Sequence, residues 1–160
     1  MIGSERKYPP QEVFARLESF CAYQERCSYE VLKKIREWGY EEGEASTFLN
    51  RLIENHFVDD ERFAHAFVSG KFRFKKWGRI KLRYELNSRK ISKEIIKSAI
   101  EQLDPEEYSS TLEELAERKW KETKGRDRWD KRYKVMRFLA SKGFESDLIS
   151  EIMEKLISSE

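Results

Sequence analysis

The sequence has few of the residues from which catalytic and metal sites are built, and it has no long apolar run. Two cysteines and two histidines, Cys21, Cys27, His56 and His65, stand at no spacing typical of a metal site. No apolar stretch approaches the roughly 18 residues that a bilayer span needs. Residues 1–7 contain no apolar segment typical of a secretion signal. We therefore expect a cytoplasmic protein that binds no membrane.

Sequence motifs typical of catalytic, phosphate-binding or metal-binding sites are also missing. The sequence contains no glycine-rich phosphate loop, nucleophile elbow, zinc-protease helix or calcium-binding loop. Asp59, Asp60 and Glu61 form the one tight acidic cluster, and acidic residues before an apolar helix are better interpreted as helix caps than as metal ligands. We expect a protein that is not an enzyme and that uses no cofactor or metal.

The composition predicts amphipathic helices. Charged and hydrophobic residues each make up 39% of the chain, a balance that suits helices with one buried stripe and broad solvated faces. Aromatic residues make up 13%, which argues against disorder because their rings bury large areas. With 7 glycines and 3 prolines, the chain has no flexible linker rich in these residues. Its parts should therefore touch.

Three segments share one apolar pattern, anchored on Tyr40, Ile91 and Phe144, which are 51 and 53 residues apart. Apolar residues stand nine and five positions before each anchor and five, eight and twelve positions after it. The set is Val31, Ile35, Ala45, Phe48 and Leu52, then Leu82, Leu86, Ile96, Ala99 and Leu103, then Val135, Leu139, Ile149, Ile152 and Leu156. Such a repeat is typical of stacked units with a long shared surface, so binding is the first hypothesis.

Start and stop signals predict nine helices, three in each unit. The expected N-caps are Ser28, Asp59 or Asp60, Ser92 and Asp104. The predicted fold is all-α, with three tandem three-helix repeats of helix-turn-helix type in an elongated, curved array. The expected units are residues 1–56, 57–104 and 105–160. Units of about 50 residues have thin cores, so neighbours must share apolar surface.

The net charge of the chain is only +2, but its acidic and basic residues are strongly segregated along the sequence. Residues 30–61 carry a net charge of −5 and residues 71–93 a net charge of +9. Residues 101–117 contain seven acidic residues and no basic one, whereas residues 118–137 have a net charge of +7. Segregation of this kind favours an anionic partner for the basic segments.

The middle unit holds the candidate binding residues. They are Lys71, Arg73, Lys75, Lys76, Arg79, Lys81, Arg83, Arg89 and Lys90. Aromatic residues alternate with them, so phosphates and stacked bases could both be bound, although inward packing explains Phe72, Phe74 and Tyr84 equally well. Arg79 and Arg83 should share a helix face, and N–H groups near Gly78 should be accessible to an anion. The partner could be nucleic acid or an acidic protein surface.

Residues 118–137 form a second basic segment, interleaved with Trp120, Trp129 and Tyr133. Acidic residues are mixed into it. A binding surface and a pair of helices linked by ion pairs are equally good interpretations of this segment.

These segments resemble the RecX family of bacterial regulators of the RecA recombinase. The resemblance rests on Arg26–Val31, Phe57–Ala64, Gly78–Leu86 and Arg137–Phe144, and it covers roughly residues 22–157. It implies three three-helix units lying along the groove of a RecA–DNA filament. There the protein would suppress ATP hydrolysis, strand exchange and filament extension, in DNA repair, recombination and the SOS response.

The same resemblance implies a protein without a catalytic site that acts on RecA and contacts single- or double-stranded DNA weakly and in a salt-dependent manner. We expect it to be a monomer. Three positions depart from the family pattern. His56 and Lys90 stand where glycine is usual, and Trp38 stands where a basic residue is common.

Two other functions remain open from the residues alone. An autonomous helical DNA-binding protein would use short helix pairs as readers and would act without RecA. A nuclease would use the acidic clusters and would require a metal.

Overall fold

The computed structural model describes residues 5–160 of the 160-residue chain, and in that part it contains nine α-helices and no strand. The helices are α1 Pro10–Tyr23, α2 Ser28–Glu37, α3 Glu42–Glu54, α4 Asp60–Gly70, α5 Arg79–Ser88, α6 Lys93–Glu101, α7 Pro105–Glu122, α8 Arg128–Ser141 and α9 Ser146–Ser158. A π-helical turn, Lys71–Lys75, extends α4. None of the described helices combines the length and apolar character that crossing a membrane requires.

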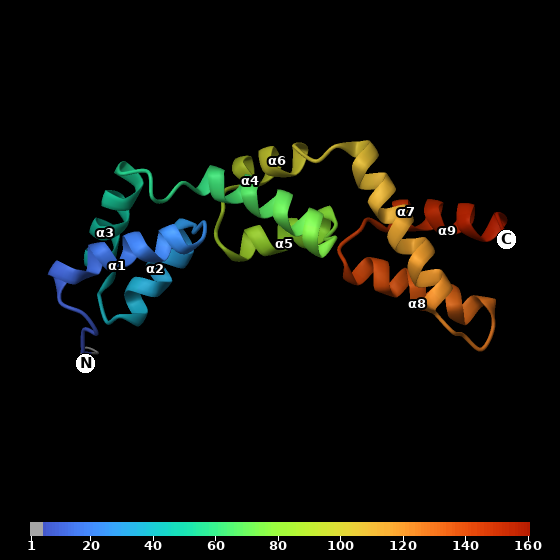
Figure 1. Cartoon of the computed structure of the whole chain (residues 1–160), viewed down its shortest axis with the longest axis horizontal. Coiled ribbons are helices and arrows are strands. Elements are labelled where there is room, and N and C mark those ends of the chain that lie inside the picture. Colours follow the sequence, from blue (N-terminus) through green and yellow to red (C-terminus); the bar gives the residue numbers. More distant parts are fainter. Residues whose placement is uncertain (1–4) are drawn as a thin grey trace.

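The helices lie in three groups along one elongated, gently curved row (Figure 1). Helices α1–α3 occupy one end, α4–α6 the middle and α7–α9 the other end. This arrangement confirms the predicted all-α array of three three-helix units. Because the units follow one another in a row, their outer surfaces are spread along the length of the molecule.

The repeated apolar pattern is the core of each unit. Its anchors Tyr40, Ile91 and Phe144 are at most 5% exposed. All other positions of the pattern are buried except Phe48, Ile152 and Leu156, which are partly buried and pack against the cores. The repeat therefore marks buried positions, and the residues between them are free to differ in charge.

A left-handed residue precedes each anchor. Gly39, Lys90 and Gly143 have φ angles of 91°, 57° and 96°. In each unit the amide of the anchor then donates a hydrogen bond of 3.3–3.4 Å to the carbonyl five residues earlier. The bond closes the end of the second helix, as in a Schellman turn. Each unit thus makes the same turn, and only the middle one makes it without glycine.

Lys90→Gly is expected to raise the free energy of unfolding by about 1 kcal/mol, because a left-handed conformation strains any residue with a Cβ. Urea denaturation followed by circular dichroism measures this change. Lys90→Ala is the matched control, since it removes the charge but keeps the Cβ. Equal stabilisation by both variants would attribute the gain to charge and contradict the backbone explanation.

Most predicted helix caps are confirmed. The side chains of Asp59, Ser92 and Asp104 accept hydrogen bonds from the amides of Arg62, Ile95 and Glu107 at the starts of α4, α6 and α7. The acidic cluster at 59–61 therefore begins a helix, as expected.

The predicted cap at Ser28 is wrong. Cys27 is the N-cap of α2, and its amide donates to the Glu30 carboxylate at 3.1 Å. The Ser28 amide instead donates to Asp60 Oδ1 at 2.7 Å, across to the second unit. The N-cap therefore lies one residue before the predicted position, and Ser28 is the first residue of α2.

The three units are unequal in their packing. Helices α1–α3 enclose their own core around Val13, Leu17 and Ile35. Helices α4–α9 share a single core in which Tyr108, at the start of α7, packs between Phe72 and Phe144. Cys27, from the first unit, is also buried in this second core. The second and third units are consequently joined by apolar packing.

Candidate binding surface

The basic segment of the middle unit comprises the π-helical turn after α4, a short connection and α5. Lys76 follows the turn in the left-handed conformation, with φ 59°, and redirects the chain into α5. Of the candidate residues, Arg73, Lys75, Lys76, Arg83 and Lys90 are exposed, and Lys71, Arg79, Lys81 and Arg89 are partly buried. The structure thus separates the candidates into two groups with different surroundings.

None of the exposed candidates takes part in an ion pair within the described part of the chain, so their charges are available to a partner. Arg73 and Lys75 come from the turn, Lys76 directly follows it, and Arg83 comes from the second turn of α5. We call these four residues the basic surface; Lys90, the fifth exposed candidate, lies beyond the end of α5 and is not included. Phe74 and Tyr84 stand beside them in the sequence and are 80% and 70% exposed, whereas Phe72 is buried. The alternation of basic and aromatic residues therefore separates into one packed ring and two solvent-facing rings.

The partly buried group packs against aromatic rings. The Lys71 and Lys81 ammonium groups lie 5.2 and 4.7 Å from the Trp77 ring centre. The Arg89 guanidinium lies 4.9 Å from the Phe67 ring centre and pairs with Glu85 at 3.0 Å. These side chains pack on rings of α4 and of the connection before α5, and their charges are less available to a partner than those of the basic surface.

Arg79 has a structural partner 66 residues away. Its guanidinium pairs with Glu145 at 2.7 Å and lies 3.8 Å from the centre of the Tyr108 ring. Its side chain is 22% exposed. Arg79 and Arg83 therefore do not form one solvent-facing pair: Arg79 joins α5 to the start of α9, and Arg83 faces solvent.

The expectation that N–H groups near Gly78 are accessible to an anion is wrong. The Gly78 amide donates to the carbonyl of Lys142 at 2.8 Å, and the Ile80 amide donates to that of Gly143 at 2.9 Å. The Arg79 amide donates to the Tyr108 hydroxyl at 2.9 Å. The third unit occupies the site that the sequence assigned to an anion.

Glu145 is the electrostatic centre of this junction. Burial alone would raise the pKa of its carboxyl, but hydrogen bonds from the Tyr108 hydroxyl and the Arg79 guanidinium outweigh burial and hold the pKa below its usual value. Burial and the Glu145 carboxylate together raise the pKa of Tyr108. The ion pair is therefore fully formed at neutral pH and links the second and third units.

Lys142 is a neighbour of the basic surface that the sequence did not reveal. Its ammonium donates to the carbonyl of Lys75 at 2.8 Å. Burial, and after it the nearby charges of Lys81 and Lys75, lower its pKa. The only sequence signal was its position directly before Gly143 in the third repeated turn.

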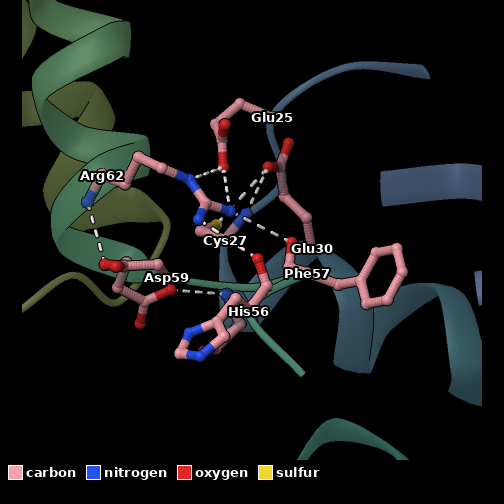
Figure 2. A network of polar contacts seen from close by, with 9 residues as sticks. Glu25, Cys27, Glu30, His56, Phe57, Asp59 and Arg62 are labelled. Atoms are coloured by element: carbon pink, nitrogen blue, oxygen red, sulfur yellow. Dashed lines mark hydrogen bonds and ion pairs between the residues drawn. The ribbon is translucent and has the colours of Figure 1, made fainter. Parts of the chain in front are cut away.

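The first unit is attached to the second by polar contacts, which Figure 2 shows around Arg62. The Arg62 side chain donates to Glu25 at 2.8 Å and to the carbonyls of His56 and Phe57 at 3.1 and 3.3 Å. His56, at a position where the family resemblance expects glycine, has φ 63°. Together with the bond between Ser28 and Asp60, these contacts fix where the acidic first unit lies relative to the basic surface.

The two cysteines are free and buried in the structure. Burial raises the pKa of the Cys21 thiol to about 11 and that of the Cys27 thiol to about 12. Both thiols are therefore protonated at neutral pH, which is typical of cysteines that serve as small apolar residues.

Comparison with known proteins places this architecture in a family. Residues 59–100 match the family model for the second three-helix domain of RecX, and residues 106–153 match that for the third. The regulatory protein RecX of Chlorobium phaeobacteroides (strain BS1) is 34% identical over 130 residues, which cover 81% of this chain and 83% of that protein. The chain belongs to the RecX family. The two matched domains contain the basic surface and the junction around Glu145.

Other RecX proteins extend the comparison. The regulatory protein RecX of Clostridium perfringens (strain 13 / Type A) is 30% identical over 133 residues, which cover 82% of this chain but 62% of that relative. The crystal structure of RecX from Lactobacillus salivarius matches with a TM-score of 0.79 at 23% identity, covering 91% of this chain and 95% of that chain. The structural likeness supports the fold.

Proposed function

We propose that this RecX-family chain regulates the RecA recombinase by lying along the groove of the RecA–DNA filament. It would inhibit ATP hydrolysis, strand exchange and filament extension by occupying that groove as a monomer in the cytoplasm, without chemistry of its own. The observation that carries this proposal is the row of three similar units, since a repeating protein is suited to a partner that also repeats (Figure 1). The name regulatory protein RecX, borne by its relatives, supports it.

Binding along several protomers explains how modest contacts could suffice. Each unit presents a small exposed surface, and the effective concentration of the second and third contacts is high once the first has formed. The basic surface would then face either DNA phosphates or acidic groups of RecA. The fixed junctions keep the three units in one geometry, which lowers the entropy lost on binding.

A titration of the chain into RecA on single-stranded DNA, with ATP hydrolysis as the readout, tests the proposal. We expect inhibition with fewer than one copy per RecA protomer, and weaker inhibition at the higher of two salt concentrations because salt screens the charged contacts. Unchanged hydrolysis at every ratio up to one copy per protomer, at both salt concentrations, would show that the chain does not regulate RecA in this way.

An autonomous DNA-binding protein is the second candidate, and the basic surface beside Phe74 and Tyr84 favours it. Nanomolar binding to bare duplex with a preference for particular bases would support this candidate. Weak binding that falls steeply with salt would instead support filament binding with DNA as an accessory contact.

A further inference from the structure

Helix α8 exposes a second set of aromatic and basic side chains, on the third unit. Trp129 and Tyr133 are 75% and 60% exposed, and Arg137 is also solvent-accessible. These three residues are four positions apart, so they lie along one face of the helix, about 6 Å from one to the next. We call them the α8 ladder. The nearby Trp120 is buried, so the aromatic residues of this segment do not all serve the core.

A guanidinium group lies near each of the two rings of the α8 ladder. The Arg132 guanidinium lies 5.6 Å from the centre of the Trp129 ring, and the Arg137 guanidinium lies 5.6 Å from that of Tyr133. The face therefore combines two exposed planar rings with the guanidinium groups of Arg137, which is exposed, and Arg132, which is partly buried. Large aromatic side chains normally bury most of their area, so two on one exposed face favour a binding role.

The carboxylate on this face is already neutralised within the chain. Asp130 pairs with Lys134 at 3.2 Å and with Arg126 at 3.7 Å. A hydrogen bond from the Arg126 amide and another from Lys134 lower its pKa, which keeps it ionised and engaged. The surrounding segment retains a net charge of +7 over residues 118–137. An approaching polyanion consequently meets mainly positive charge.

A groove runs beside the α8 ladder, between α7 and α8. It has a volume of about 610 Å³, and its charged lining residues are Lys119, Glu122, Asp130, Lys134 and Arg137. The three basic residues outnumber the two acidic ones, and Lys134 is paired with Asp130. Arg137, which forms none of the described ion pairs, is therefore the lining residue available to a phosphate backbone while the rings remain available to the bases.

We propose that the α8 ladder binds single-stranded nucleic acid, with Trp129 and Tyr133 stacking on unpaired bases and Arg137 contacting phosphates. The spacing distinguishes a single strand from a duplex. Bases in a duplex are about 3.4 Å apart and have no free faces, whereas rings about 6 Å apart can each receive one base of an extended strand. The proposal adds a base-contacting surface on the third unit and does not depend on RecA.

Binding of a fluorescein-labelled dT oligonucleotide, measured by anisotropy without RecA, tests the α8 ladder. The double variant Trp129→Ala, Tyr133→Ala is expected to bind about 30-fold more weakly or worse, with an unchanged dependence on salt, because stacking involves no charge. Arg137→Gln should instead reduce the salt dependence. Tyr23→Ala is the matched control, since Tyr23 is 83% exposed on the first unit, and it should bind like the wild type.

A conservative variant distinguishes the loss of a stacking ring from a change in folding. Trp129→Phe retains a stacking ring and should keep most of the binding, but it should lose the quenching of tryptophan fluorescence that dT causes in the wild type. Unchanged dT affinity in the double variant would overturn the proposal. So would a double variant that binds dT normally yet no longer inhibits RecA, because the surface would then contact protein. A wild type that binds dT without affecting RecA, together with the loss of dT binding expected in the double variant, would support the α8 ladder and contradict only the proposed function.

Discussion

A Gly78→Ala variant is expected to lose about 2–4 kcal/mol of its free energy of unfolding. Gly78 has φ −80°, a conformation that alanine adopts freely, so the expected effect is steric. A Cβ at this position would stand 2.6 Å from the backbone nitrogen of Phe144 and closer still to the carbonyl of Gly143. These are backbone atoms, so the start of α5 and the turn after α8 must separate. The hydrogen bonds from Gly78 to Lys142 and from Ile80 to Gly143 would be strained or lost.

Urea denaturation followed by circular dichroism measures this loss, and Gly70→Ala is its matched control. Gly70 belongs to the same unit and is the last residue of α4, and a Cβ added there would meet no neighbouring atom within 4 Å. Alanine in this helical position should stabilise the protein by about 0.5–1 kcal/mol. The two glycine substitutions should thus have opposite signs. Equal stability of both variants would show that the second and third units are not held in contact at Gly78.

Removal of the four charges of the basic surface is expected to have the largest effect on function. The variant replaces Arg73, Lys75, Lys76 and Arg83 with glutamine and leaves Arg79 in place, because Arg79 pairs with Glu145. If each exposed charge contributes about 0.7 kcal/mol to binding, the concentration for half-inhibition of RecA should rise about 100-fold. The salt dependence of inhibition should weaken at the same time, since fewer counterions are released. ATPase titrations at two salt concentrations measure both quantities.

Net charge alone could also weaken binding, so a second quadruple variant is needed. Lys33, Arg36, Arg51 and Lys155 are exposed on the first and third units, and their replacement with glutamine removes the same charge. This control should inhibit nearly as well as the wild type. If both variants lost inhibition equally, attraction would be general and the basic surface would not be the contact. If neither lost inhibition, the filament would bind elsewhere.

The fold was predictable because its determinants are local and repeated. Six apolar positions recur in three copies, and all of them are buried or partly buried in the structure. The caps at Asp59, Ser92 and Asp104 depend on residues three positions away, which a sequence displays directly. At α2 the predicted cap was one residue too late: Cys27 is the N-cap, and Ser28, the first residue of the helix, donates through its amide to Asp60 of the next unit.

The candidate surface was predictable only in part, because its surroundings depend on distant residues. Composition located the basic segment but could not separate Arg83, which faces solvent, from Arg79, whose partner is 66 positions away. Lys142 joins the surface through the turn after α8, and no local pattern connects it to Lys75. The boundaries of the three units and the binding roles of the candidate residues stay predictions.

The three units have similar cores but different surface charges, so the two ends of the molecule are not equivalent. Units with identical surfaces could slide along a repeating partner by one step, or bind it in several equivalent positions. Here a segment of charge −5 precedes one of charge +9, and the two are held in fixed order by the contacts of Arg62 and Asp60. A shift by one unit would place unlike charges opposite the same site and would be penalised. On a polar filament such as the partner proposed above, the array would therefore specify both its register and its orientation.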